Sequence, residues 1–109
     1  MHPMEKLEYI KKAAKAMDHN LHEAETHIRK AYDMRDKCQM TADWYKDMAH
    51  RHLEFNTIGR AIYDRKMREL AEMPEAAEYL VGIKTAYNDW IGEINEKTAE
   101  VMTMIQMYK

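Results

Sequence analysis

Histidine and carboxylate side chains recur at helical spacing in the first quarter of the chain. His19, Glu23 and His27 follow one another at intervals of four residues. Residues four apart share one face of a helix, and imidazole and carboxylate groups are common ligands of metal ions in proteins. A helix here therefore carries three metal-ligating side chains in one row.

A second group of the same residue types follows at Asp47, His50 and Glu54, spaced three and four. If the chain turns back near residue 39, His27 lies roughly level with residue 51 of an antiparallel neighbour. The two groups can then approach one another and bind a transition metal. The predicted metal site comprises His19, Glu23, His27, His50 and Glu54.

The phase of the first helix favours a simpler interpretation of these residues. If Leu21 and Ala24 face the core, His19 and Glu23 point outward and only His27 flanks the core. We therefore favour a solvated polar face over a metal site, and we expect no cofactor. His52 stands on an apolar stripe with Tyr45 and is expected to pack against neighbours, with a proton-sensitive contact as the alternative.

Charge is distributed unevenly along the chain. Residues 46–68 hold six Lys or Arg against three Asp or Glu, a net of +3, and residues 69–109 hold three against eight, a net of −5. Basic side chains interleaved with tyrosine can bind a nucleotide or another phosphorylated small molecule. The candidates are His50, Arg51, Arg60, Tyr63, Arg65, Lys66 and Arg68. We favour the alternative in which the basic helix lies along the acidic one.

Signatures of catalysis are absent from the sequence. The chain contains neither a Gly-x-Gly-x-x-Gly motif nor a phosphate-binding P-loop, and it has no serine that could act as a nucleophile. Cys38 has Arg35 and Lys37 nearby, which can lower a thiol pKa, but one cysteine near a turn is more often incidental. We expect a protein that is not an enzyme.

Composition indicates a single helical domain. The chain has 109 residues, of which 46% are hydrophobic and 33% charged, with three Gly and two Pro. Few helix breakers and many Ala, Met, Glu, Lys and Arg are typical of long helices. A single cysteine fits a reducing compartment, and neither a signal peptide nor a membrane span is evident. We expect a cytoplasmic protein, and the net charge of −2 argues against a nucleic-acid partner.

The apolar periodicity predicts three long helices over residues 4–36, 42–72 and 75–108. In the first, apolar or small residues alternate at steps of three and four, at Leu7, Ile10, Ala14, Met17, Leu21, Ala24, Ile28 and Ala31. The predicted stripe of the second is Tyr45, Met48, His52, Phe55, Ile58, Ile62, Leu70 and Met73. Thr41 is the expected N-cap of the second helix. Pro74 should end it and open the third.

Similar lengths and short turns favour an elongated antiparallel bundle, one domain over residues 1–109. Two alternatives stay open. The first two helices can fuse, because the heptad phase continues through residues 35–52. The second helix can instead break near Gly59, which gives four helices.

Apolar residues exceed what one stripe per helix needs, above all near the C-terminus. The expected interface with another chain is Trp90, Ile91, Val101, Met102, Met104, Ile105 and Tyr108. We therefore expect a homo-oligomer that binds a protein partner as a small non-catalytic adaptor or inhibitor, of the kind found among accessory proteins of phages or other mobile elements. The alternatives are a bundle that sequesters a phosphorylated small molecule and a metal-binding bundle.

Overall fold

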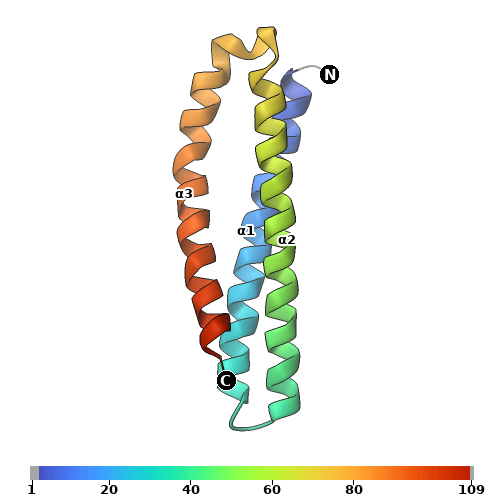
Figure 1. Ribbon diagram of the computed structural model, residues 1–109, viewed down its shortest axis with the longest axis vertical. Coiled ribbons are helices and arrows are strands. Elements are labelled where there is room, and N and C mark those ends of the chain that lie inside the picture. Colours follow the sequence, from blue (N-terminus) through green and yellow to red (C-terminus); the bar gives the residue numbers. More distant parts are fainter. Residues whose placement is uncertain (1–2, 109) are drawn as a thin grey trace.

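The computed structural model describes residues 3–108, with the side chains of all of these except residues 3, 78, 79, 83 and 86. It contains α1 (Pro3–Met34), α2 (Gln39–Ala71), a short 3-10 helix η1 (Pro74–Ala76) and α3 (Ala77–Met107). Between residues 3 and 108 there is no strand. The molecule measures 57 × 22 × 15 Å. In Figure 1, α1 runs downward from the N-terminus, α2 runs upward and α3 runs downward. The predicted all-α antiparallel bundle is confirmed.

The core face of α1 is the predicted one. Its buried residues include Ile10, Ala14, Met17, Leu21, Ala24, Ile28 and Ala31, each at most 2% exposed. They alternate at steps of four and three, so they form one continuous stripe along α1. This regular stripe allows α2 to pack along α1 over most of its length (Figure 1).

The turn between α1 and α2 falls in the predicted region, and the two helices do not fuse. The amides of Lys37 and Cys38 both donate to the carbonyl of Met34, at 2.9 and 2.8 Å, which closes the end of α1. The predicted N-cap at Thr41 is wrong, because α2 begins at Gln39 and Cys38 occupies the N-cap position without a side-chain cap. Thr41 instead donates its hydroxyl hydrogen to the Cys38 sulfur at 3.2 Å.

The buried face of α2 differs from the predicted stripe, which is a correction. Its buried residues are Ala42, Ala49, Asn56, Gly59, Tyr63 and Leu70. Five of these recur every seven residues, and three of the six are Ala or Gly. A Cβ on Gly59 would stand 2.9 Å from the Cγ of Met17, so small residues are required where α1 and α2 meet. The larger Phe55, Ile58 and Ile62 are therefore displaced to the surface.

Helix α2 runs without a break through Gly59, so the four-helix alternative is wrong. Pro74 follows the end of α2 and opens η1, as the sequence predicts. The chain then reverses, and α3 lies along one side of the α1–α2 hairpin, with its C-terminal end near the α1–α2 turn (Figure 1). Among the described residues, no helix is both long and apolar enough to cross a membrane.

Candidate functional site

Two histidines and a glutamate come together where α1 and α2 face one another. Glu23 and His27 lie one turn apart on α1, and His52 approaches them from α2. One ligand atom from each lies within 4.8 Å of the other two. The ring centroids of His27 and His52 are 5.2 Å apart. All three side chains are partly buried.

Carbonyl oxygens fix the orientation of both histidine rings. The Nδ1 of His27 lies 2.7 Å from the main-chain carbonyl of Glu23, which can only accept a hydrogen bond. Asn20 donates its amide hydrogen to the carbonyl of Ala16 at 2.9 Å, which turns its Oδ1 toward the Nδ1 of His52 at 3.1 Å. Each Nδ1 is therefore the donor, and each neutral ring keeps a free lone pair on Nε2.

Aromatic side chains surround the histidine pair. The rings of Trp44 and Tyr45 lie 6.2 and 5.9 Å from His27, and Phe55 lies 6.4 Å from His52. Burial lowers the pKa of His52, positive charge on His27 lowers it further, and the Glu23 carboxylate opposes both effects. The lowered pKa favours the neutral ring, which is the form that binds metal ions.

The five residues of the predicted metal site do not form one group. Glu23 and His27 meet, but His50 and Glu54 are exposed, and His50 lines a cavity of about 110 Å³ against Met102 and Ile105 of α3. His52 takes the place assigned to His50, because His52 lies on the side of α2 that faces α1, where the predicted stripe also placed it, whereas His50 lies on the exposed side. His19 is exposed, yet its charge still lowers the pKa of His52.

The basic residues of α2 do not converge on one surface. Arg60 donates to Asp64 of its own helix at 3.2 Å and also to Asn95 of α3. Lys66 lies over the ring of Tyr9 on α1, and Tyr63 is buried. The other predicted members, namely His50, Arg51, Arg65 and Arg68, are exposed. Among the described residues no ion pair joins α2 to α3, so the expected pairing of basic and acidic helices lacks such a contact.

Large apolar side chains are exposed along one face of α2. Trp44, Phe55 and Ile58 are 55, 53 and 55% exposed, and Ile62 is 36% exposed. We call these four residues the α2 stripe. The spacing of the large apolar residues predicted Phe55, Ile58 and Ile62 in the core. The signal that could have identified the buried face of α2 is the seven-residue spacing of the small residues Ala42 and Ala49.

The predicted interface near the C-terminus is used mostly within the chain. Ile91, Val101, Ile105 and Tyr108 are buried, because the end of α3 packs on the hairpin. The Tyr32 hydroxyl, for example, donates to the carbonyl of Met104 at 2.7 Å. Of the seven residues, only Met102 is exposed, and Trp90 and Met104 are partly buried. Assembly through this surface stays a prediction.

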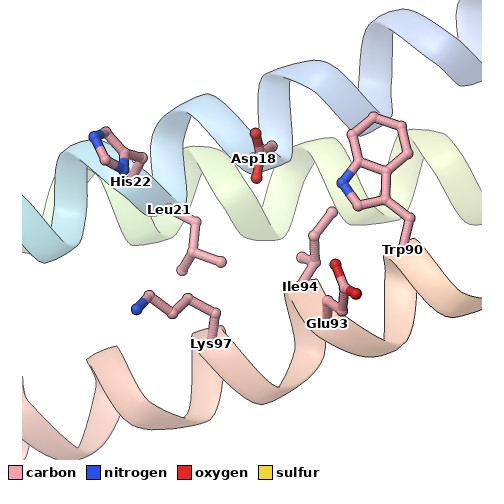
Figure 2. A pocket seen from close by; sticks show the side chains of 7 residues that line it. All are labelled: Asp18, Leu21, His22, Trp90, Glu93, Ile94 and Lys97. Carbon is pink, nitrogen blue, oxygen red and sulfur yellow. The ribbon is translucent and has the colours of Figure 1, made fainter.

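An open cavity of about 240 Å³ lies between α1 and α3 (Figure 2). Leu21 and Ile94 point into it from opposite helices, and Trp90 reaches across toward α1 (Figure 2). The remaining lining residues are Asp18, His22, Glu93 and Lys97. Lys97 pairs with Glu25, so charges of both signs surround a small apolar floor, and no single ligand chemistry is indicated.

A second cavity of about 340 Å³ is lined in part by Asn56, Arg60, Asn95 and Thr98. Asn56 is 5% exposed and donates a long hydrogen bond of 3.4 Å to the Thr98 hydroxyl. Its Oδ1 has no hydrogen-bond partner among the described protein atoms. A buried acceptor without a partner destabilises the fold, so Asn56 is a position at which substitution is informative.

Cys38 is exposed in the turn between α1 and α2. The hydrogen bond from the Thr41 hydroxyl is the main cause that lowers the pKa of its thiol. The neighbouring Arg35 and Lys37, singled out in the sequence, are not among the causes. No general base among the described residues is hydrogen-bonded to this thiol.

The fold and these surfaces define a three-helix antiparallel bundle with a histidine-rich hairpin. Comparison of the chain with protein-family models, with curated proteins and with solved structures finds no match.

Proposed function

We propose that this chain is a small non-catalytic adaptor or inhibitor that binds another protein through the α2 stripe. The observation that carries the proposal is the exposure of Trp44, Phe55, Ile58 and Ile62 on one helix face. Large exposed apolar side chains on one helix face commonly mark a protein interaction site. Aromatic residues are also enriched among the residues that contribute most to binding.

The dimensions of the α2 stripe suit a helical partner. From Trp44 to Ile62 the helix advances about 27 Å at roughly 1.5 Å per residue. A partner helix of about 20 residues covers this distance. Amphipathic helices bind such surfaces by laying their own apolar face against them.

Two arginines indicate the charge of this partner. Arg51 and Arg65 stand seven residues before and after Ile58, so the three share one side of α2. Both arginines are exposed, and neither has an ion-pair partner among the described residues. We therefore propose an amphipathic helix with Asp or Glu beside its apolar face, because carboxylates can pair with these guanidinium groups. A second copy of this chain is the competing occupant.

Trp44 provides an intrinsic reporter for the test. The chain has two tryptophans, so in a Trp90→Phe background Trp44 is the only tryptophan, and excitation at wavelengths that tyrosine does not absorb reports on Trp44 alone. The binding test uses two helical peptides of about 20 residues. Both carry a face of leucines, and they differ only in whether Glu or Lys flanks that face. The Glu peptide should shift the Trp44 emission to the blue and bind at least about tenfold more tightly than the Lys peptide, a difference of about 1.4 kcal/mol.

Matched variants locate the binding surface. Ile58→Glu should abolish binding of the Glu peptide. Val81→Glu should leave this binding unchanged, because Val81 is exposed on a different helix, α3. Equal binding of both peptides would remove the charge argument. If neither peptide binds and sedimentation gives a dimer that Ile58→Glu dissociates, the occupant is a second copy.

A further inference from the structure

We propose that Glu23, His27 and His52 bind a divalent transition-metal ion of the zinc class. Two imidazoles and one carboxylate are a ligand set that Zn²⁺ accepts. The ligand atoms within 4.8 Å of one another need to close to about 3.3 Å, the separation set by tetrahedral bonds of about 2.0 to 2.1 Å. Rotation of partly buried side chains on two packed helices can make that adjustment.

Hydrogen bonds prepare both imidazoles for this role. In metal sites, the ring nitrogen opposite the ligand atom usually donates to a carbonyl or carboxylate oxygen. Here the Nδ1 of His27 donates to the Glu23 carbonyl, and that of His52 donates to Asn20. In a neutral ring, Nε2 is therefore the nitrogen left free to bind a metal ion. The Glu23 carboxylate lies 3.9 Å from the Nδ1 of His27, so the His27 ring and the Glu23 side chain must reorient for both to bind one ion. Asn20 is a positioning residue, and its own amide is held by Ala16.

The residues around Glu23, His27 and His52 also favour the binding of a metal ion. Tyr45 and Phe55 lie beside His27 and His52 and limit the access of water to the imidazoles. The carboxylate of Glu23 supplies a negative charge to the cluster. Three protein ligands leave further coordination positions open, and exposed His19 lies one turn before Glu23.

Calorimetric titration of metal-free protein with ZnCl₂ tests the site. We expect saturable binding of one ion per chain. Co²⁺ should give the visible absorption of a tetrahedral nitrogen and oxygen site. Loss of an outer ligand partner typically weakens metal binding about 10- to 100-fold, so Asn20→Ala should fall in this range. His27→Gln and His52→Gln should each weaken binding at least about 100-fold.

His50→Gln and Glu54→Gln are the matched controls, because both residues are exposed on α2. These variants should bind Zn²⁺ as the unaltered chain does, and circular dichroism should show all variants equally helical. The proposal is overturned if micromolar Zn²⁺ gives no saturable binding, or if His50→Gln weakens binding as much as His52→Gln. One ion per two chains would also contradict a site completed within one chain.

Discussion

Gly59 of α2 lies so close to Met17 of α1 that a Cβ at residue 59 would stand 2.9 Å from the Met17 Cγ. It would also lie 3.6 Å from the carbonyl oxygen of Ala13. Alanines occupy other contact positions along the same pair of helices, including Ala42 and Ala49. Close approach of the two backbones is therefore what selects the small residues of α2.

Substitution of Gly59 should separate helix propensity from packing. Alanine gains about 1 kcal/mol over glycine in a helix interior, but at Gly59 it forces buried Met17 to move, at a cost of about 1 to 3 kcal/mol. Gly59→Ala should therefore lower the free energy of unfolding. Gly92→Ala, with no atom within 4 Å of the added Cβ, should raise it by about 0.5 to 1 kcal/mol. Urea unfolding compares the two, and stabilisation by Gly59→Ala would contradict the close contact.

Replacement of Asn56 by leucine should stabilise the protein. The change removes a buried acceptor without a partner and loses only a long hydrogen bond. Thr98 remains satisfied because its hydroxyl donates to the Ile94 carbonyl at 2.7 Å. We expect an increase of about 1 kcal/mol in the free energy of unfolding, measured by thermal and urea denaturation. A decrease would indicate that a water molecule or a ligand in the adjacent cavity satisfies the amide.

The ion pair between Glu25 and Lys97 should make the free energy of unfolding depend on pH in the acidic range. A hydrogen bond from Lys97 holds the pKa of Glu25 below its usual value, although burial partly opposes this. Because the folded-state pKa is depressed, the stabilisation is present above the unfolded-state pKa near 4.5 and is lost as pH falls through the folded-state value.

Lys97→Met should reduce this acid dependence and slightly lower the free energy of unfolding at pH 7, because exposed ion pairs are screened by solvent. Lys84→Met is the control, since Lys84 is exposed on α3 and has no ion pair among the described residues. Urea unfolding between pH 3 and pH 7, a range set around the usual carboxyl pKa, distinguishes the two variants. Identical pH profiles would show that the ion pair contributes nothing.

Substitutions in the α2 stripe should leave the stability of the fold nearly unchanged. Ile58 is 55% exposed, whereas Ile28 is fully buried. Ile58→Lys should change the free energy of unfolding by no more than about 0.5 kcal/mol, and Ile28→Ala should lower it by about 2 to 5 kcal/mol. Thermal denaturation of both variants is the measurement. A large loss with Ile58→Lys would mean that this side chain belongs to the fold and not to a binding surface.

The sequence was sufficient to predict the helices because their signals are local. The three-and-four spacing of α1 and the position of Pro74 each act within a few residues. The core face of α2 depended on a different kind of information. Which face packs against α1 is determined by how closely two backbones approach, and large residues such as Phe55 gave a misleading local pattern.

The same contrast between local sequence signals and contacts between helices applies to the candidate metal site. Glu23 and His27 could be paired from their spacing alone, since both lie on α1. His52 faces α1 and His50 is exposed, a difference that the position of His52 on the predicted apolar stripe already indicated. The orientation of His52 by Asn20 is a contact between helices and leaves no signal in sequence spacing.

Photo-crosslinking in the cells that make this protein tests the central claim most directly. A photoreactive residue replaces Ile58 in one strain and Val81 in another, since both positions are exposed. We predict that position 58 gives a discrete adduct with a second protein, joined within an amphipathic helix that carries Asp or Glu beside its apolar face, and that position 81 does not. The absence of an adduct at position 58, or an adduct only with another 13.0 kDa copy of this chain, would contradict the proposed partner.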